Sequence, residues 1–484
     1  MNRNVVFYLI GCLAVGNGLV LLIPMAAALF WGEAGLRYFG PAAAAALLFG
    51  GYCLYRGRTH KRHLGAGEGA WYMVAVWVFL GLLGMIPYLM AGTFASPADA
   101  FFESVSAFTT TGTSCLADGG AALPSSLFLW HSLMEWLGGL NFILILVSVL
   151  PQVSGCFGLT LSVHQSVAFS PMVSRMESAA RQAGCIYVTI TLCSMVLYWL
   201  AGLPAGTAFH QGLMTMSTSG GDALFDFSNY DSLGLEAAGA LSMLLASGNF
   251  LLYWKAWERR DVKSLFKDAE LRTFLILIAF TGLIVSLHLW RHGVYDGWDN
   301  LRYGFFQVLS FSSTSGFASA DYAAWPEFDK YILFALAFVG GCIGSATGGL
   351  KVMRFMVLFK MAAQEMRRTL HPHMVISLKI DDIPVDMKII SRVLSYFFLF
   401  MGTFFLSMLI ISLSGFTPMQ AMGVAIGCLS SVGSTMELFG INDVSVLPAW
   451  TKIYCSFLMI LGRVEIFSFL IVLQTAFGYL RRRW

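Results

Sequence analysis

Four short segments rich in serine and threonine, each ending on a glycine, recur along this chain. They end at Gly112, Gly220, Gly316 and Gly433, so the intervals are 108, 96 and 117 residues. The three residues before each glycine make twelve positions, and eleven of them carry a hydroxyl group. Such a period is typical of a chain built from repeated structural units. Roughly a hundred residues is enough for two membrane-spanning helices and their loops.

The apolar content of the chain requires a lipid environment. Of 484 residues, 57% are hydrophobic and only 12% are charged, which is more apolar surface than one soluble core can bury. Several apolar runs approach the roughly 20 residues that cross a bilayer. These runs are residues 5–31, 71–90, 126–150, 186–203 and 274–290. We therefore predict an all-α membrane protein with many spans, and we expect the first run to stay in the mature chain.

Basic residues cluster in four segments, residues 56–62, 255–267, 360–379 and 481–483. Loops rich in Lys and Arg stay in the cytoplasm. The loops between them hold Asp118, Asp222, Asp321 and Asp443 and are poor in basic residues, so we expect them to face outward and both termini to be cytoplasmic. Since membrane topology explains the basic clusters, we expect no nucleic-acid partner.

Each unit is predicted to hold a spanning helix, a half-length helix, the polar glycine segment and a second spanning helix. In the first unit these are residues 71–90, 101–108, 109–113 and 126–150. A ten-residue helix is only about 15 Å long, so it must enter the membrane and turn back. Irregular polar backbone at that depth is tolerated only where it lines a cavity, and a cation can satisfy its carbonyl groups. Four units then give pseudo-fourfold symmetry about one pore.

Two further columns of residues align with the glycines. Phe101, Phe209 and Phe305 lie eleven residues before their glycine, and Glu103, Gln211 and Gln307 lie nine before; Met422 and Val424 break the columns in the fourth unit. Small residues also pack membrane helices, which is the alternative explanation for a single such segment. Four segments in register favour a selectivity filter. The candidate ion-binding residues are Thr110, Thr111, Gly112, Thr113, Thr218, Ser219, Gly220, Gly221, Thr314, Ser315, Gly316, Phe317, Ser431, Val432, Gly433 and Ser434.

These sequences resemble the superfamily of bacterial Trk/Ktr and plant or fungal HKT/Trk potassium transporters, and the Trk branch most closely. Residues 101–113 (FFESVSAFTTTGT) are similar to the first pore helix and filter of that family, residues 311–317 (FSSTSGF) to the third filter, and residues 136–139 (WLGG) to the helix after the first filter. The resemblance implies two extra N-terminal transmembrane helices, here about residues 5–31 and 38–55. It divides the chain into residues 1–69, 70–155, 156–265, 266–370 and 371–484.

The resemblance also implies a function and partners. It implies potassium uptake across the bacterial inner membrane, with bound K⁺ at the filter residues and no covalent cofactor. A homodimer and a cytoplasmic regulatory ring that binds NAD or ATP are further implications. Whether transport is channel-like or coupled to another ion stays open. The intact Gly112 favours potassium, because a serine there is associated with sodium selectivity in the plant branch; sodium or mixed transport is the alternative.

A glycine-rich segment at residues 340–352 (GGCIGSATGGLKV) interrupts a long apolar run. Each glycine lowers helix stability by about 1 kcal/mol, which predicts a break, although close helix packing explains such glycines equally well. The resemblance makes residues 340–351 an intramembrane gating loop beneath the filter, with Gly344, Gly348, Gly349 and Lys351 as its candidate residues.

Arg463 lies in the middle of the last apolar run, where a charge is costly and marks a functional candidate. By resemblance it projects into the pore below the filter as an electrostatic barrier or latch. The alternative is a buried ion pair with Glu135 or another carboxylate.

Departures from the family pattern occur in two filters. The second reads STSGGD at residues 217–222 and leaves its register open, and the fourth reads SSVGST at residues 430–435. Two rival classes are disfavoured. The chain has no HExxH, P-loop or GxSxG motif, so we expect no enzyme. Four units in one orientation also differ from the inverted halves of alternating-access transporters.

Overall fold

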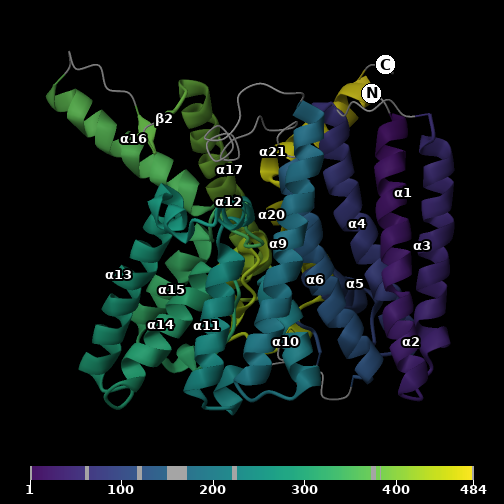
Figure 1. Ribbon diagram of the computed structural model, residues 1–484, viewed down its shortest axis with the longest axis horizontal. Helices are drawn as coiled ribbons and strands as arrows, with labels where there is room; N and C mark the ends of the chain where they lie inside the picture. Colours follow the sequence, from purple (N-terminus) through teal and green to yellow (C-terminus); the bar gives the residue numbers. More distant parts are fainter. Residues whose placement is uncertain are drawn as a thin grey trace.

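The computed structural model of the chain describes residues 3–59, 65–116, 123–149, 172–220, 226–371, 378–381 and 383–481. Within these residues, the regular elements are helices apart from one short antiparallel ladder between β1 (Lys379–Ile380) and β2 (Ile383–Pro384) (Figure 1). In the described part of the chain, seven helical segments are long and apolar enough to cross a membrane, and two sharply bent helix pairs raise that number to nine. The predicted all-α membrane fold is confirmed.

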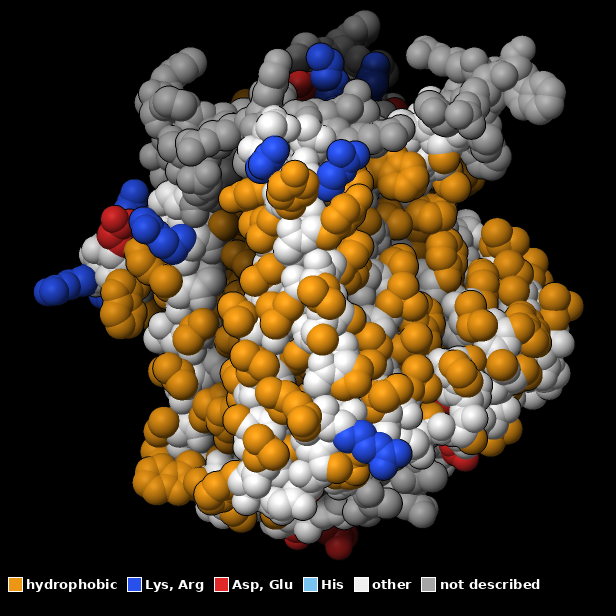
Figure 2. Space-filling model, turned by 90° about the vertical axis from the view of Figure 1, so that its right-hand side faces the viewer, with side chains coloured by type: hydrophobic (Ala, Val, Ile, Leu, Met, Phe, Trp, Pro, Cys, Tyr) orange, Lys and Arg blue, Asp and Glu red, His pale blue; other side chains and the backbone are white. Residues whose placement is uncertain are grey.

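Two spans at the N-terminus lie side by side at one edge of the molecule (Figure 1). The first is α1 (Arg3–Val20) continued by α2 (Leu22–Phe30), and the second is α3 (Gly35–Gly57), which packs along α1. Large apolar side chains stay exposed here, including Leu29, Phe30 and Leu48. Figure 2 shows hydrophobic side chains over most of this face. An apolar surface of this size needs lipid to cover it.

Four units of similar construction follow. In each, a long helix leads into a short buried pore helix, and a second helix returns. The first unit has α4 (Ala66–Ala91), α5 (Pro97–Phe108) and α6 (Ser125–Ser148); the second has α9 (Met172–Leu200), α10 (Ala205–Ser217), α11 (Leu233–Ser247) and α12 (Phe250–Arg259); the third has α13 (Ala269–His292), α14 (Asp299–Ser312), α15 (Glu327–Val339) and α16 (Val352–Leu370); the fourth has α17 (Met387–Ser412), α18 (Pro418–Ser430), α19 (Ser434–Glu437), α20 (Ala449–Val464) and α21 (Ile466–Arg481). Short 3₁₀ turns lie at Phe227–Asn229, Val262–Lys267, Tyr322–Ala324 and Val444–Val446.

The units close into a ring through one repeated contact. The second helix of each unit packs on the pore helix of the next: α6 on α10, α11 on α14, α15 on α18, and α20 back on α5. Glycines also permit close packing inside two of the units, because a Cβ at Gly138 on α6 would meet the main-chain oxygen of Phe108 on α5, and one at Gly462 on α20 that of Leu429 on α18. The ring explains why pore helices as short as 12 residues stay buried at its centre.

Three of the four returning helices are broken. The helix pair α11 and α12 bends by 95° and the pair α20 and α21 by 106°. In the third unit, residues 340–351 between α15 and α16 are not helical. Both ends of the chain lie at the same end of the molecule as β2 and the far end of α16 (Figure 1). This end carries basic residues of the segment 360–379, including Lys360, Arg367 and Arg368.

Candidate functional site

Each pore helix ends in the same way, two residues before the aligned glycine. The residue there adopts a left-handed conformation in all four units, with φ of 50°, 58°, 56° and 56° at Thr110, Thr218, Thr314 and Ser431. The next residue donates its amide to the carbonyl five positions back, at 2.9–3.1 Å, in the pairs Thr111–Ser106, Ser219–Met214, Ser315–Ser310 and Val432–Gly427. This is the Schellman pattern of a helix end. A left-handed non-glycine residue costs about 1–3 kcal/mol, so its fourfold recurrence marks a functional segment.

The aligned glycines play two different structural roles. Gly112 and Gly316 have φ of 69° and 77°, the left-handed region that glycine reaches at little cost. Gly433 has φ −56° and is needed for space instead, because a Cβ there would lie 2.7 Å from the carbonyl oxygen of Thr111. A Cβ at Gly220 would meet the ring of Phe317. Gly112 and Gly316 therefore provide an unusual backbone angle, whereas Gly220 and Gly433 are required for space.

The four segments come together at the centre of the ring. The first and fourth are in direct contact, since the amide of Gly433 donates to the oxygen of Thr111 at 2.8 Å. The second and third meet where Phe317 lies against Gly220. The candidate residues Thr110, Thr111, Thr113, Thr218, Ser219, Thr314, Ser315, Phe317, Ser431, Val432 and Ser434 are all at most 5% exposed. Gly221 lies outside the described residues.

The hydroxyl groups two residues before the glycine differ in their partners. In the first unit Thr110 Oγ1 accepts a hydrogen bond from Arg463, and in the third Thr314 Oγ1 accepts one from the amide of Gly348 at 3.0 Å. The hydroxyls of Thr218 and Ser431 have no hydrogen-bond partner among the described residues. The candidate gate residues Arg463 and Gly348 therefore bond the hydroxyls of the first and third units, and the hydroxyls of the second and fourth units lack a partner in the described part of the chain.

Arg463 joins the first pore helix to the loop of the third unit. Its Nε donates to the carbonyl of Thr109 at 2.6 Å and its Nη1 to that of Ala346 at 2.8 Å. The guanidinium also lies over the ring of Phe142, 4.6 Å from its centre, and Arg463 is only 3% exposed. Glu135, the alternative partner considered above, accepts a hydrogen bond from Ser219 instead.

The loop of residues 340–351 is held from several directions. A Cβ at Gly348 would meet the carbonyl oxygen of Ser430, at the end of the fourth pore helix. The amide of Phe250, beside the break of the second unit, donates to the carbonyl of Gly344 at 3.2 Å. Glu270 Oε1 accepts from the amide of Ile343 at 2.8 Å and from that of Met353 at 3.2 Å, at either end of the loop.

Lys351 closes the loop on itself. Its buried ammonium donates to the hydroxyl of Thr347 at 2.8 Å and to the main-chain oxygen of the same residue, and it lies 5.5 Å from the ring centre of Phe142.

Unusual backbone angles mark the breaks of the third and fourth units. Lys351 has φ 76°, and Glu465, which pairs with Arg354 at the break between α20 and α21, has φ 62°. Gly344 and Gly349 have φ of 87° and 71°. A cavity is lined by Phe142, Thr347, Lys351, Gly462, Arg463 and Glu465, among others.

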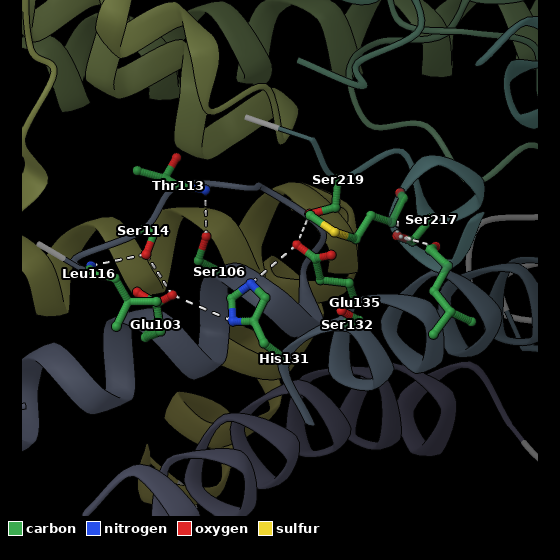
Figure 3. A network of polar contacts seen from close by, with 12 residues as sticks. Glu103, Ser106, Thr113, Ser114, Leu116, His131, Ser132, Glu135, Ser217 and Ser219 are labelled. Atoms are coloured by element: carbon green, nitrogen blue, oxygen red, sulfur yellow. Dashed lines mark hydrogen bonds and ion pairs between the residues drawn. The ribbon is translucent and has the colours of Figure 1, made fainter. Parts of the chain in front are cut away.

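A buried polar network lies next to the first two filters (Figure 3). It was not predicted from the sequence. His131 on α6 lies between Glu103 on the first pore helix and Glu135 one turn further along α6, with nitrogen-to-oxygen distances of 3.5 and 3.4 Å. All three are at most 2% exposed. The feature that could have revealed it is a His and a Glu four residues apart inside an apolar helix.

Comparison with known proteins adds the family. The model of the TrkH family, described as cation transport protein, matches residues 39–476. The chain is 30% identical to the Trk system potassium uptake protein TrkH of Salmonella typhimurium over 487 residues and to that of Escherichia coli K12 over 488, covering 99% of each chain in both cases. The crystal structure of the potassium transporter TrkH from Vibrio parahaemolyticus superposes with a TM-score of 0.89 at 27% identity, over 98% of this chain and 99% of that one. This chain belongs to the TrkH family of cation transport proteins.

Proposed function

We propose that this chain carries potassium into the cell through a single pore lined by the four glycine segments. The main observation behind the proposal is that all four pore helices end in the same way, with a left-handed hydroxyl residue two positions before the aligned glycine. The four segments that follow lie buried next to one another, which is the arrangement expected of a pore lining. The names of the relatives, potassium uptake proteins that match along their whole length, support the same ion.

The ion would be held by oxygen atoms of the chain. Carbonyl and hydroxyl oxygens of the candidate filter residues replace the hydration shell of K⁺, and the carboxyl ends of four pore helices direct their partial negative charge toward it. No covalent cofactor is needed for this chemistry. The carbonyl of Thr111 retains a second lone pair beside its bond from Gly433, so it can still face an ion.

The gate would be the loop of residues 340–351 together with Arg463. Three observations support this: Arg463 bonds both Thr109 and Ala346, Gly348 bonds Thr314, and Lys351 lies buried in the same region. Two positive charges beneath a cation filter raise the barrier for a third. Opening then requires the loop and Arg463 to move away from the filter.

We further propose the setting of the molecule. Both termini and the basic end of α16 face the cytoplasm of a bacterial inner membrane, because basic segments stay inside. The chain works as a homodimer, and a cytoplasmic ring that binds NAD or ATP acts on the gate from that side. The contact between Asp381, in the hairpin after α16, and the amide of Ala269, next to Glu270, at 3.4 Å offers a path from the surface to the loop.

Sodium or mixed transport is the second candidate. The filters are not equivalent, since the fourth carries Val432 without a hydroxyl, and of the four aligned glycines Gly112 and Gly316 have positive φ whereas Gly433 does not. Such asymmetry favours weaker discrimination between K⁺ and Na⁺.

Flux into liposomes separates the two candidates. Purified protein is reconstituted and uptake of K⁺, Rb⁺ and Na⁺ is measured with and without a proton gradient. We expect K⁺ and Rb⁺ to enter and Na⁺ to be largely excluded. Equal entry of all three ions contradicts potassium selectivity, and dependence on the proton gradient identifies coupled transport.

A further inference from the structure

Two buried carboxyl groups, those of Glu103 and Glu135, accept hydrogen bonds from residues in or next to the first two filters. Glu103 accepts hydrogen bonds from the hydroxyl of Ser114 and from the amide of Cys115, both at 2.8 Å, directly after the first filter. Glu135 accepts one from the hydroxyl of Ser219, inside the second filter, at 2.6 Å. Losing such a buried hydrogen bond is costly, because the group left without its partner is desolvated and unsatisfied. Glu103 therefore holds the backbone directly after the first filter, and Glu135 holds the side chain of Ser219 in the second.

His131 links these two clamps. Its Nδ1 faces Glu103 and its Nε2 faces Glu135, as Figure 3 shows, so the ring forms a bridge between them. The hydroxyl of Tyr88 on α4 lies 3.0 Å from Nδ1 and orients the ring from a third helix. The bridge crosses from the first unit to the second, because Ser219 belongs to the second filter.

The network is specific to one side of the ring. The positions equivalent to Glu103 in the other units are Gln211, Gln307 and Val424, so only the first unit carries an ionisable group in this column. Gln211 Nε2 donates to the hydroxyl of Thr215 within its own pore helix. The two polar atoms of Gln307 have no hydrogen-bond partner among the described residues. The third and fourth filters are thus held by other contacts.

We propose that Glu135 and His131 are positioning residues that set the selectivity between monovalent cations by fixing the first and second filters relative to each other. The inference rests on the proposed function of the filters. Selectivity in such pores depends on the spacing and the rigidity of the oxygen atoms that replace the water of the ion. Functional groups of this kind must be held to within about 0.5 Å, and buried hydrogen bonds to Glu103 and Glu135 can hold them in this way.

The test is the ratio of K⁺ to Na⁺ uptake in liposomes, which does not depend on how much active protein is recovered. We expect Glu135→Ala to lower the ratio about tenfold, the effect of losing one buried hydrogen bond. Glu135→Gln keeps an acceptor for Ser219 and should lower it less. His131→Gln should lower the ratio while both carboxylates remain.

Ser132→Ala is the matched control. Ser132 neighbours His131 on α6 and bonds His210 across the same boundary between units, at 2.9 Å, but its other bond goes to Phe128 on its own helix. This variant should keep the wild-type ratio. Wild-type ratios in both Glu135→Gln and His131→Gln would overturn the inference even if Glu135→Ala fails to fold. If the wild-type protein shows no selectivity, the proposed function itself fails instead.

Discussion

The Nη1 of Arg463 donates a hydrogen bond to the main-chain oxygen of Ala346 at 2.8 Å, which connects α20 to the loop of the third unit. The same guanidinium bonds Thr109 at the end of the first pore helix. One side chain therefore connects the filter, the broken helix of the fourth unit and the loop that interrupts the third.

Replacing this arginine should open the pore. Arg463→Ala removes a buried positive charge and two bonds to main-chain oxygens, so we expect basal K⁺ flux in liposomes to rise about tenfold, equal to roughly 1.4 kcal/mol of barrier. Arg463→Lys keeps the charge but cannot make all of these bonds, and its flux should lie between the two. Unchanged flux in both variants would assign Arg463 to packing.

Gly348 tests the resting position of the loop. A Cβ at this position would collide with the carbonyl oxygen of Ser430, so Gly348→Ala must displace the loop from the fourth pore helix and weaken its bond to Thr314. We expect a severalfold increase in basal flux. Gly402→Ala, in α17, is the control because a Cβ there meets nothing within 4 Å. Equal flux in the two variants would argue against a closed loop in this structure.

Gly112 tests the geometry of the first filter. With φ of 69°, a serine at this position is strained by about 1–2 kcal/mol and shifts the carbonyl groups on either side. We expect Gly112→Ser to reduce K⁺ uptake and to lower the ratio of K⁺ to Na⁺ flux. Gly440→Ser carries a similar strain, with φ of 82°, in open surroundings and should leave the ratio unchanged. A common loss in both variants would point to folding rather than to the filter.

The ring of units is locked by an ion pair between the fourth and the first. The ammonium of Lys452 on α20 lies 2.7 Å from Asp99 on the first pore helix and 2.8 Å from the carbonyl of Ser445. Lys452→Ala leaves both acceptors without this donor and should lower the free energy of unfolding by about 1–3 kcal/mol. Thermal unfolding in detergent measures the loss. The control is Lys330→Ala, whose pair with Glu327 lies at the surface and contributes at most about 1 kcal/mol; equal losses would contradict the prediction.

The sequence alone predicted the membrane class, the four repeated units and the positions of the polar segments. Apolar runs and a hundred-residue period can both be found by comparing residues along the chain, without knowing its fold. The predicted half-length helix at residues 101–108 corresponds to α5 (Pro97–Phe108), and the predicted span at 71–90 to α4 (Ala66–Ala91). These features depend on hydrophobicity and length, which composition records directly.

Only the tertiary structure decided what each special residue does. The left-handed conformation falls on Thr218 and Ser431, not on the glycines two residues later, and Gly433 is required by its contact with Thr111, 322 residues earlier in the chain. Likewise, only the structure shows that His131 lies between the carboxyl groups of Glu103 and Glu135. The contact of Gly433 with Thr111 forms where the fourth unit meets the first, and that of His131 with Glu103 forms where two helices of one unit pack, so both depend on the folded arrangement and not on the local sequence.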